Sequence, residues 1–155
     1  MTITARPIRL EDFAQWVTLW ENYNTFYKRT LAEEVTRTTW SRFFDVYEPV
    51  HSLVADKAGK LIGFTNYLFH RSTSMVRATC YLQDLYTDEA ARRQGVGRAL
   101  IEAVYQRATD AGCQRVYWQT HETNATARRL YDRVAERSGF IVYSKKLGLS
   151  GFEKK

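Results

Sequence analysis

Hydrophobic and polar positions follow two different periods along the chain. Alternation is typical of strands, and a spacing of three or four residues is typical of helices. The alternating segments predict strands over 2–8, 51–56, 61–70, 76–87, 115–120 and 140–147. The helical spacing predicts helices over 10–27, 32–47, 95–111 and 124–138. The elements therefore follow the order β-α-α-β-β-β-α-β-α-β.

Turn signals separate these segments. The residues "KAGK", 57–60, join two predicted strands and are typical of a hairpin. Asn124 suits the N-cap of the last helix, and Gly112 and Gly139 suit helix ends. Hairpins make neighbouring strands antiparallel, so we expect an α/β fold with one mixed, mostly antiparallel, twisted sheet flanked by helices. A chain of 155 residues favours a single domain, 1–155, with a frayed tail from about residue 148.

Composition narrows the class of protein. Hydrophobic residues make up 45% and charged residues 26% of the chain, as in soluble globular proteins. The net charge of +6 is spread along the sequence without a basic helix, which argues against a nucleic-acid partner. Cys80 and Cys113 lie in apolar segments, and without CxxC or His/Cys clusters no metal site is predicted. No apolar run is long enough for a membrane span and the N-terminus lacks a signal core, so we expect a cytoplasmic protein.

The stretch "YTDEAARRQGVGRALIEAV", 86–104, combines positive charge and glycines where a strand meets a helix. Backbone N–H groups at a helix N-terminus lack intrahelical partners and carry partial positive charge, so phosphates bind there. Gly95 and Gly97 allow an anion to approach, and Arg92, Arg93 and Arg98 add charged donors. A Walker A loop and a GxGxxG fingerprint are both absent. Taken alone, the stretch fits an anion cradle and a glycine-rich loop with solvated arginines equally well.

A family resemblance favours the cradle. The residues "RRQGVG", 92–97, resemble the R/Q-x-x-G-x-G/A signature of the GNAT superfamily of acetyl-CoA-dependent N-acetyltransferases. The residues "NATARRLYDR", 124–133, are similar to the N-x-x-A-x-x-L-Y segment of that family, and "YLQDLY" and "ENYNTFY" resemble its diamine/polyamine branch. The resemblance runs from about Ile3 to Lys146. It departs from the family at Glu89, at Arg93 and in a longer spacing after Tyr131.

The resemblance implies acetyl-CoA as cosubstrate and assigns residues to it. A strand edge would pair with the pantetheine arm, a loop would wrap the pyrophosphate through its N–H groups, and one side chain would bind the cofactor arm. The strand edge consists of Leu85, Tyr86 and Thr87. The loop consists of Arg92, Arg93, Gln94, Gly95, Val96, Gly97 and Arg98. The side chain that binds the cofactor arm is Asn124. Tyr131 would protonate the leaving thiolate, although its place in an apolar helical stripe equally fits a core residue.

The attacking amine also needs a base. Asp84 on its strand and Glu122 before the second motif are the candidates. Alternation places Asp84 on one face with Cys80, Leu82 and Tyr86, near the expected cleft, while a structural carboxylate is the other interpretation.

The resemblance also implies that the first helical region forms part of the acceptor wall. Glu21, Glu33 and Glu34 would there bind the second ammonium group of a diamine, or would only form a solvated helix face. Tyr23, Phe26 and Tyr27 would line the same wall or only pack as a stripe.

The leading hypothesis is an N-acetyltransferase that acts on a small primary amine, with diamine- or polyamine-like acceptors favoured. The alternatives are a protein N-terminal or lysine acetyltransferase and a non-catalytic CoA-binding sensor. A homodimer is compatible with the family resemblance. No metal, nucleic acid or membrane is expected to take part.

Overall fold

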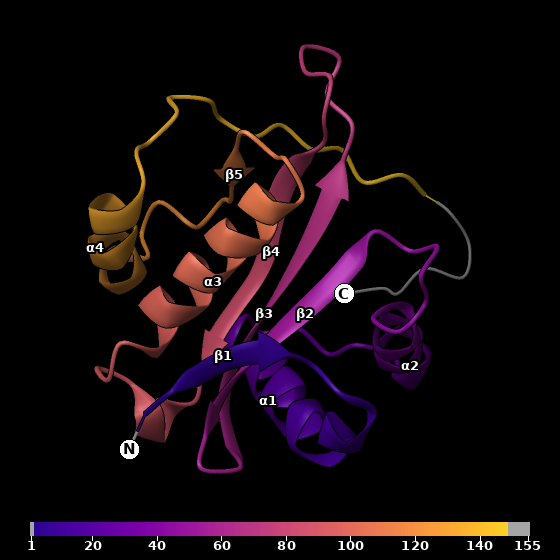
Figure 1. The fold of residues 1–155 in the computed structure, drawn as a ribbon, viewed down its shortest axis with the longest axis vertical. Helices are drawn as coiled ribbons and strands as arrows, with labels where there is room; N and C mark the ends of the chain where they lie inside the picture. The colour runs from indigo at the N-terminus through magenta and orange to yellow at the C-terminus, as the bar shows by residue number, and fades with distance from the viewer. Residues whose placement is uncertain (1, 149–155) are drawn as a thin grey trace. The chain divides into compact units, whose positions relative to one another are not determined.

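The computed structural model describes residues 2–148 (Figure 1). Its helices and strands are β1 (Thr4–Pro7), α1 (Phe13–Phe26), α2 (Glu33–Arg42), β2 (Val50–Lys57), β3 (Lys60–His70), β4 (Thr79–Thr87), α3 (Val96–Asp110), β5 (Val116–Tyr117) and α4 (Ala125–Val134). Contacts divide the chain into two compact units, the first ending at Gln119 and the second beginning at Thr120. The strands and α1 to α3 belong to the first unit, and α4 belongs to the second.

A mixed sheet forms the centre of the first unit, in the strand order β1-β2-β3-β4-β5. Strands β1 to β4 pair antiparallel, and β5 joins β4 in parallel. Ala58 and Gly59 both have positive φ, 53° and 87°, which is the geometry of a two-residue hairpin turn between β2 and β3. The predicted mixed sheet and the hairpin at 57–60 are confirmed.

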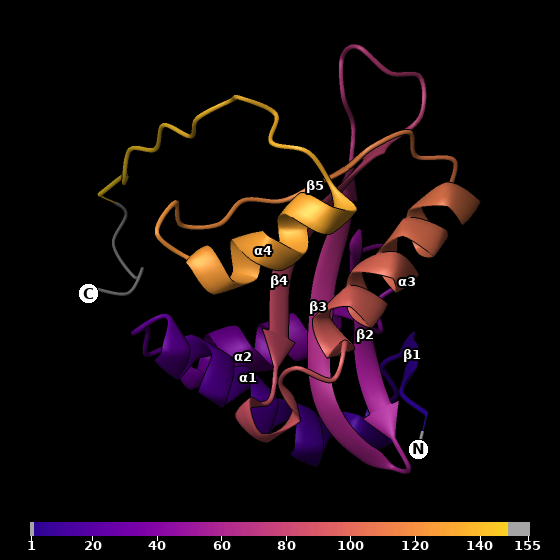
Figure 2. The same cartoon turned by 90° about the vertical axis from the view of Figure 1, so that its left-hand side faces the viewer.

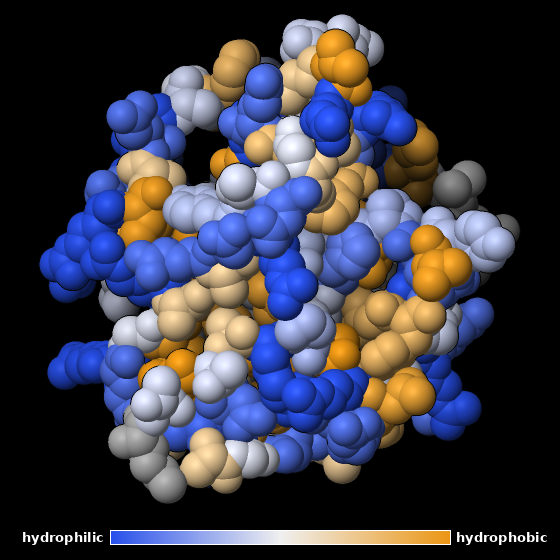
Figure 3. Space-filling model, in the orientation of Figure 1, coloured by the Kyte–Doolittle hydropathy of each residue, from blue (hydrophilic) through white to orange (hydrophobic). Residues whose placement is uncertain are grey.

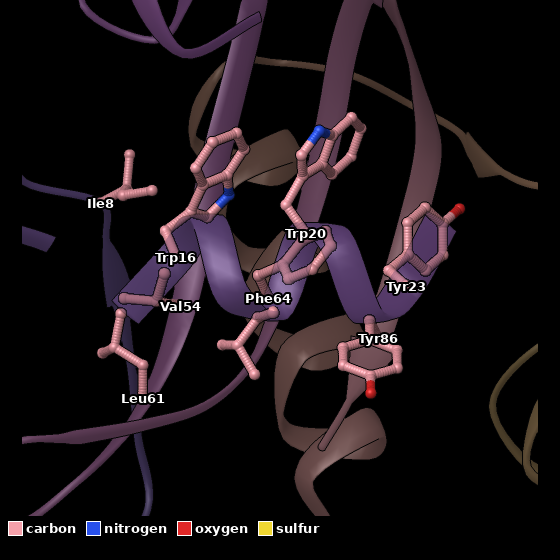
Figure 4. Close-up of a cluster of buried hydrophobic side chains, with 9 residues drawn as sticks. Ile8, Trp16, Trp20, Tyr23, Val54, Leu61, Phe64 and Tyr86 are labelled. Carbon is pink, nitrogen blue, oxygen red and sulfur yellow. The ribbon is translucent and has the colours of Figure 1, made fainter. Parts of the chain in front are cut away.

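Helices cover both faces of this sheet. Figure 2 shows α1 and α2 on one side of β3 and β4, and α3 on the other side. Helix α1 buries Trp16, Leu19, Trp20 and Tyr23, whose spacing of three and four residues puts them on one side of the helix. Their partners in the core are Ile8, Val54, Leu61, Phe64 and Tyr86, all of which are labelled in Figure 4.

Helix α3 packs closely against the sheet because β3 contains a glycine at the contact. A Cβ atom on Gly63 would lie 2.6 Å from the carbonyl oxygen of Tyr86 and 3.0 Å from a methyl carbon of Val96. The first distance is shorter than Cβ atoms show in proteins, and the second would need a small shift of the Val96 side chain. The absent side chain therefore lets the first turn of α3 lie against β3 and β4, at the point where the predicted anion cradle begins.

Strand β4 contains a bulge in the middle of its ladder with β3. Asn66 lies opposite Asp84, whereas the next residue, Tyr67, lies opposite Leu82. Gln83 is thus the extra residue on β4, as in a β-bulge. Consecutive residues of β3 point to opposite faces, so their partners on β4 do so as well.

The bulge corrects one prediction about this strand. Alternation predicts that Cys80, Leu82, Asp84 and Tyr86 share one face. Asp84 and Tyr86 do share the α1 face, but Leu82 and Cys80 lie on the other face because the extra residue reverses the alternation. A bulge leaves no signal in the hydrophobic pattern when the extra residue is polar, as Gln83 is.

Some predicted elements are shorter, and one is absent. Strand β5 contains two residues instead of the predicted 115–120, and α2 ends at Arg42 instead of residue 47. Residues 140–147 form no strand, and the side chains of Phe140 and Tyr143 are 90% and 89% exposed. Strand propensity needs a partner strand and a buried face, and no strand within residues 2–148 pairs with this segment.

The second unit contains α4, which begins where the sequence predicts it. Asn124 is the N-cap, and its Oδ1 accepts a hydrogen bond from the N–H of Ala127. The helix ends at Val134, since the next residue, Ala135, is extended with φ −155°. The expected frayed tail from about residue 148 falls, for residues 149–155, outside the described part of the chain.

Candidate functional site

The chain turns sharply between β4 and α3, where the sequence predicts an anion cradle. Arg93 and Gly95 have positive φ, 66° and 80°. Gly95 is the N-cap of α3 and has no side chain that could cap the N–H groups of residues 96–98. These amides, together with the dipole of a 15-residue helix, present partial positive charge at this end. The backbone here therefore presents N–H donors and partial positive charge, as the predicted anion cradle requires.

Arginines surround this helix end. Arg92, Arg93 and Arg98 are all exposed. The guanidinium of Arg92 lies over the ring of Phe26 at 5.8 Å, and Arg98 pairs with Glu102 at 2.9 Å, an i,i+4 pair on the helix surface. The predicted cluster of positive charge is present, with Arg92 oriented by an aromatic ring of α1.

The remaining loop residues attach the cradle to the sheet. Gln94 accepts a hydrogen bond of 3.0 Å from the Nζ of Lys57. Val96 is buried against the sheet near Gly63, and Gly97 follows it without a side chain. The loop is thus anchored at both sides, and its N–H groups lie at a fixed helix end.

The strand edge beside the cradle is open over the residues that the sequence predicts for the pantetheine arm. Leu85, Tyr86 and Thr87 pair on one side with residues 63–65 of β3. On the other side β5 pairs only with Cys80 and Tyr81 of β4. Within residues 2–148, no strand therefore occupies the second edge of 85–87, and its backbone groups are arranged as strand addition requires.

Asp84 lies at the centre of a buried polar cluster on the α1 face. Its Oδ1 accepts a hydrogen bond of 2.8 Å from the hydroxyl of Tyr23, and its Oδ2 accepts one of 3.0 Å from Nδ2 of Asn66. The residue is 9% exposed, and burial raises the pKa of its carboxyl above the ordinary value, while the bonds from Asn66 and Tyr23 oppose that rise. A carboxyl with a raised pKa is a stronger proton acceptor once it is ionised.

Sequence reasoning did not identify Asn66, the second partner of Asp84. It lies in the apolar segment "GFTNYLF", and its side chain is buried at 3% exposure. Its Oδ1 accepts no hydrogen bond from the described residues. An amide inside an otherwise apolar strand is the signal that could have identified this position, because buried amides need partners.

Tyr23 of α1 packs as the stripe predicts and also reaches the polar cluster, while a part for Tyr23, Phe26 and Tyr27 in an acceptor wall stays a prediction. The ring of Tyr23 packs against Phe64 at 5.5 Å and Tyr86 at 6.0 Å, as a core residue does (Figure 4). Its hydroxyl nevertheless reaches Asp84, and the burial raises the pKa of the phenol, so it stays a donor. Tyr27 follows at the end of α1, in contact with Tyr23 at 5.1 Å.

The glutamates of the first helical region do not join this cluster. Glu21 and Glu34 are exposed, and Glu33 is 78% exposed and pairs with Arg37 on the same helix at 2.6 Å. A solvated helix face is the interpretation that their exposure favours.

The residues predicted from the second motif lie in the second unit. Asn124 caps α4, and its Nδ2 donates to Oγ1 of Thr120 at 3.3 Å. Tyr131 lies within α4, and its carbonyl accepts the N–H of Ala135 at 2.9 Å. Glu122 precedes the helix, and its carbonyl accepts a bond from Arg128. The roles of Tyr131 and Asn124 toward the cosubstrate stay predictions.

Other features of the surface carry less chemistry. A shallow hollow of about 350 Å³, lined by residues such as Thr109, Cys113 and Arg115, contains none of the predicted site residues. Among residues 2–148, no group of three His, Cys, Asp or Glu side chains could hold a metal ion. In the same part of the chain, no helix has the length and apolar character to cross a membrane. Figure 3 shows hydrophilic side chains spread over one face among smaller hydrophobic groups.

Comparison with known sequences identifies two relationships. Residues 14–135 match the model of the acetyltransferase (GNAT) family. The chain is 38% identical over 145 residues to the D-amino-acid N-acetyltransferase HPA3 of Saccharomyces cerevisiae, across 92% of this chain and 90% of that protein.

Comparison with solved structures identifies the same fold. A ribosomal-protein-alanine N-acetyltransferase from Brucella melitensis superposes with a TM-score of 0.80 at 17% identity, over 95% of this chain and all of that one. The aminoglycoside N-acetyltransferase AAC(6')-Iy, solved with a CoA-containing bisubstrate analog, superposes with a TM-score of 0.82 at 16% identity, over 95% of this chain and 99% of that one.

Proposed function

Because this chain belongs to the acetyltransferase (GNAT) family and is an acetyl-CoA-dependent N-acetyltransferase, we propose that it acetylates the amine of a small, free amino acid. The observation that carries the proposal is the buried Asp84, held by Tyr23 and Asn66 on the α1 face of β4. The similarity to a D-amino-acid N-acetyltransferase over most of both chains supports the acceptor class. The family match extends into both units, and we propose that they form one acetyltransferase domain.

The donor half of the site would be the cradle. The N–H groups at the start of α3 are suited to the pyrophosphate of acetyl-CoA, with Arg92, Arg93 and Arg98 as the charged rim. Gln94 and its neighbours hold the loop, and the open edge of 85–87 would pair with the amide groups of the pantetheine arm. Asn124 would contribute a further hydrogen bond to that arm, as the second motif implies.

The acceptor half would centre on Asp84. An aliphatic ammonium must lose a proton before its nitrogen can attack, and Asp84 would accept that proton directly or through water. The nitrogen then bonds to the thioester carbonyl carbon, the carbon–sulfur bond breaks, and CoA leaves as a thiolate. Backbone N–H groups near Tyr86 would stabilise the oxyanion, and Tyr131 would give its proton to the thiolate. The attached nitrogen then loses its second proton, which replaces the proton that Tyr131 gave, and the proton taken by Asp84 passes to solvent. Each turnover therefore yields one N-acetylated product, one CoA thiol and one proton.

The acceptor preference inferred from the polyamine-like motifs receives less support than the amino-acid class. A polyamine site needs carboxylates for a second ammonium, and Glu33 is instead paired with Arg37 on an exposed surface. Glu21 and Glu34 are exposed on their helices. The carboxylate that is buried and oriented, Asp84, suits a single amine.

An acceptor panel tests the proposal. The purified protein is given acetyl-CoA and, separately, both enantiomers of an amino acid, the corresponding decarboxylated amine, a diamine, and a short peptide with a free N-terminus. A thiol reagent measures CoA release. We expect the highest kcat/KM with an amino acid. A higher value with the diamine or the peptide would reassign the acceptor, and CoA binding without thiol release from any acceptor would make the protein a CoA sensor.

A further inference from the structure

Helix α1 ends in a turn that fixes the residue following it. Lys28 has φ of 56°, a left-handed conformation that costs a non-glycine residue about 1–2 kcal/mol. The N–H of Lys28 donates to the carbonyl of Thr25, and the N–H of Arg29 donates to the carbonyl of Asn24, both at 2.9 Å. These are the two hydrogen bonds of a Schellman motif, here without the usual glycine. The backbone of Arg29 is therefore held directly after the helix.

The side chain of Arg29 stacks on two tyrosines. Its guanidinium carbon lies 5.4 Å from the ring centroid of Tyr23 and 5.3 Å from that of Tyr27, within cation–π range. Arg29 is exposed, and among residues 2–148 no carboxylate pairs with it. Stacking orients the planar guanidinium while leaving its N–H donors for another group.

Other arginines of the first unit differ in this respect. Arg6 bonds both Asp12 and Asp56. Arg37 and Arg98 each pair with a glutamate four residues away on their own helix. Arg29 instead combines a fixed backbone, a stacked side chain and unused donors, which is the form of an anion receptor.

The ring of Tyr23 connects this cation to the buried carboxylate. One face of the ring carries Arg29, and the hydroxyl on the same ring donates to Asp84. The positive charge of Arg29 also acts to lower the pKa of Asp84, which places the two groups within electrostatic range. Beside Asp84, the buried Oδ1 of Asn66 accepts no hydrogen bond from the described residues, although an amine N–H could donate to it.

We propose that Arg29 binds the carboxylate of the acceptor amino acid while the amine of that acceptor lies at Asp84 and Asn66. The inference rests on the proposed function. An α-amino acid carries both charges on one carbon, and the cation and anion across Tyr23 complement it. A second ammonium, as in a diamine, would meet the charge of Arg29 and be repelled, so Arg29 determines specificity.

A second arginine near α1 has a different place. Arg92 of the cradle lies over Phe26, and the ring of Phe26 packs edge-on against Tyr27 at 5.1 Å. The aromatic pair therefore separates Arg92 from Arg29. Two separate cations beside one helix end suit two separate anions, the pyrophosphate of the donor and the carboxylate of the acceptor.

The test compares an amino acid with its decarboxylated amine in the wild type and in Arg29→Gln. The substitution should lower kcat/KM for the amino acid roughly 10- to 100-fold, as expected for a lost charged hydrogen bond. It should lower kcat/KM for the decarboxylated amine much less, because that acceptor has no carboxylate and is affected only through the pKa of Asp84, and it should leave KM for acetyl-CoA unchanged. Arg29→Lys should recover part of the loss, because lysine keeps the charge without the planar fork. Arg37→Gln, which removes an exposed positive charge from α2, is the matched control and should leave kcat/KM for both acceptors unchanged.

The outcomes separate the inference from the function on which it rests. Suppose that the wild type prefers the amino acid, and that Arg29→Gln lowers kcat/KM for both acceptors equally or raises KM for acetyl-CoA. Arg29 then does not bind the acceptor carboxylate, and the proposed function stands. If the wild type acetylates the decarboxylated amine better than the amino acid, both proposals are overturned. Thermal unfolding of Arg29→Gln should match the wild type, since the side chain is exposed.

Discussion

The phenol oxygen of Tyr23 lies 2.8 Å from Oδ1 of Asp84, although the two residues are 61 positions apart. This bond joins the end of α1 to the middle of β4, next to the bulge at Gln83. It gives a buried carboxyl a fixed direction and links it to the tyrosine that carries Arg29. The acceptor half of the proposed site therefore depends on this hydrogen bond between helix and strand.

Replacing Asp84 by asparagine should separate activity from stability. Loss of the proposed base should lower kcat/KM roughly 100-fold or more, the usual range for general base catalysis. The fold should be as stable as the wild type at neutral pH or more so, because the buried charge is removed. The new amide oxygen still accepts from Tyr23, and the new N–H can donate to Oδ1 of Asn66 once that amide turns. Steady-state kinetics and thermal unfolding of the same preparation measure both quantities.

The difference in stability between the wild type and Asp84→Asn should also depend on pH. The folded-state pKa of Asp84 is raised, so between about pH 4, its ordinary pKa, and the folded pKa the unfolded chain has lost a proton that the folded chain keeps. The wild type therefore loses stability as pH rises through that window, and Asp84→Asn does not. The Tm of the variant minus that of the wild type should grow across the window and then stay constant. A difference that shrinks with rising pH would mean that the pKa is lowered.

Tyr23→Phe should shift the pH dependence of catalysis. The hydrogen bond from Tyr23 lowers the pKa of Asp84, so removing the hydroxyl should raise it further. The rising limb of kcat/KM against pH should then move to higher pH. Tyr47→Phe, at a position that is 94% exposed, should leave the profile unchanged. An unshifted profile for Tyr23→Phe would show that Asp84 does not set that limb.

Gly97→Asp should weaken CoA binding roughly 10-fold or more, because a carboxylate at the second position of α3 faces the proposed pyrophosphate. The helix itself tolerates an acidic residue in its first turn, so the fold should persist. Gly97→Asn adds nearly the same volume without charge and should weaken binding less. Calorimetric titration measures the affinity for CoA of the wild type, Gly97→Asp and Gly97→Asn. Equal affinity of Gly97→Asp and the wild type would contradict the cradle.

Gly63→Ala should destabilise the first unit. The new Cβ would meet the carbonyl oxygen of Tyr86 at 2.6 Å, and backbone cannot move aside cheaply. We expect a loss of about 1–3 kcal/mol in the free energy of unfolding, as for other overpacked interiors. For a chain of this size that corresponds to a fall in Tm of about 2–4 °C per kcal/mol. Gly148→Ala, where a Cβ would meet nothing within 4 Å, should unfold like the wild type.

Much of the fold follows from periodicity in the sequence. The stripe that includes Trp16 and Trp20 is buried as a helix of three-to-four spacing must be, and the turn at Gly59 forms the predicted hairpin. Alternation predicts that Asp84 shares a face with Tyr86, and both residues do lie on the α1 face. These features depend on residues that are close together in the sequence, so the pattern of neighbouring residues predicts them.

The features that sequence reasoning missed depend on pairing between distant segments. The bulge at Gln83 is defined by the register with β3, and it moves Leu82 to the opposite face. The partnership of Asn66 with Asp84 likewise requires the two strands to be aligned. Arg29 lies next to a predicted helix, but its significance comes from the rings on which it stacks. Residues 140–147 have strand composition, yet no described strand pairs with them.

The most direct test of the proposed function is the ratio of kcat/KM for an amino acid to kcat/KM for its decarboxylated amine, measured with the wild-type protein at saturating acetyl-CoA. If the acceptor amine lies at Asp84 and its carboxylate at Arg29, this ratio should be roughly 10 or more for at least one enantiomer. A ratio of about one or less for both enantiomers would contradict the assignment of a free amino acid as acceptor.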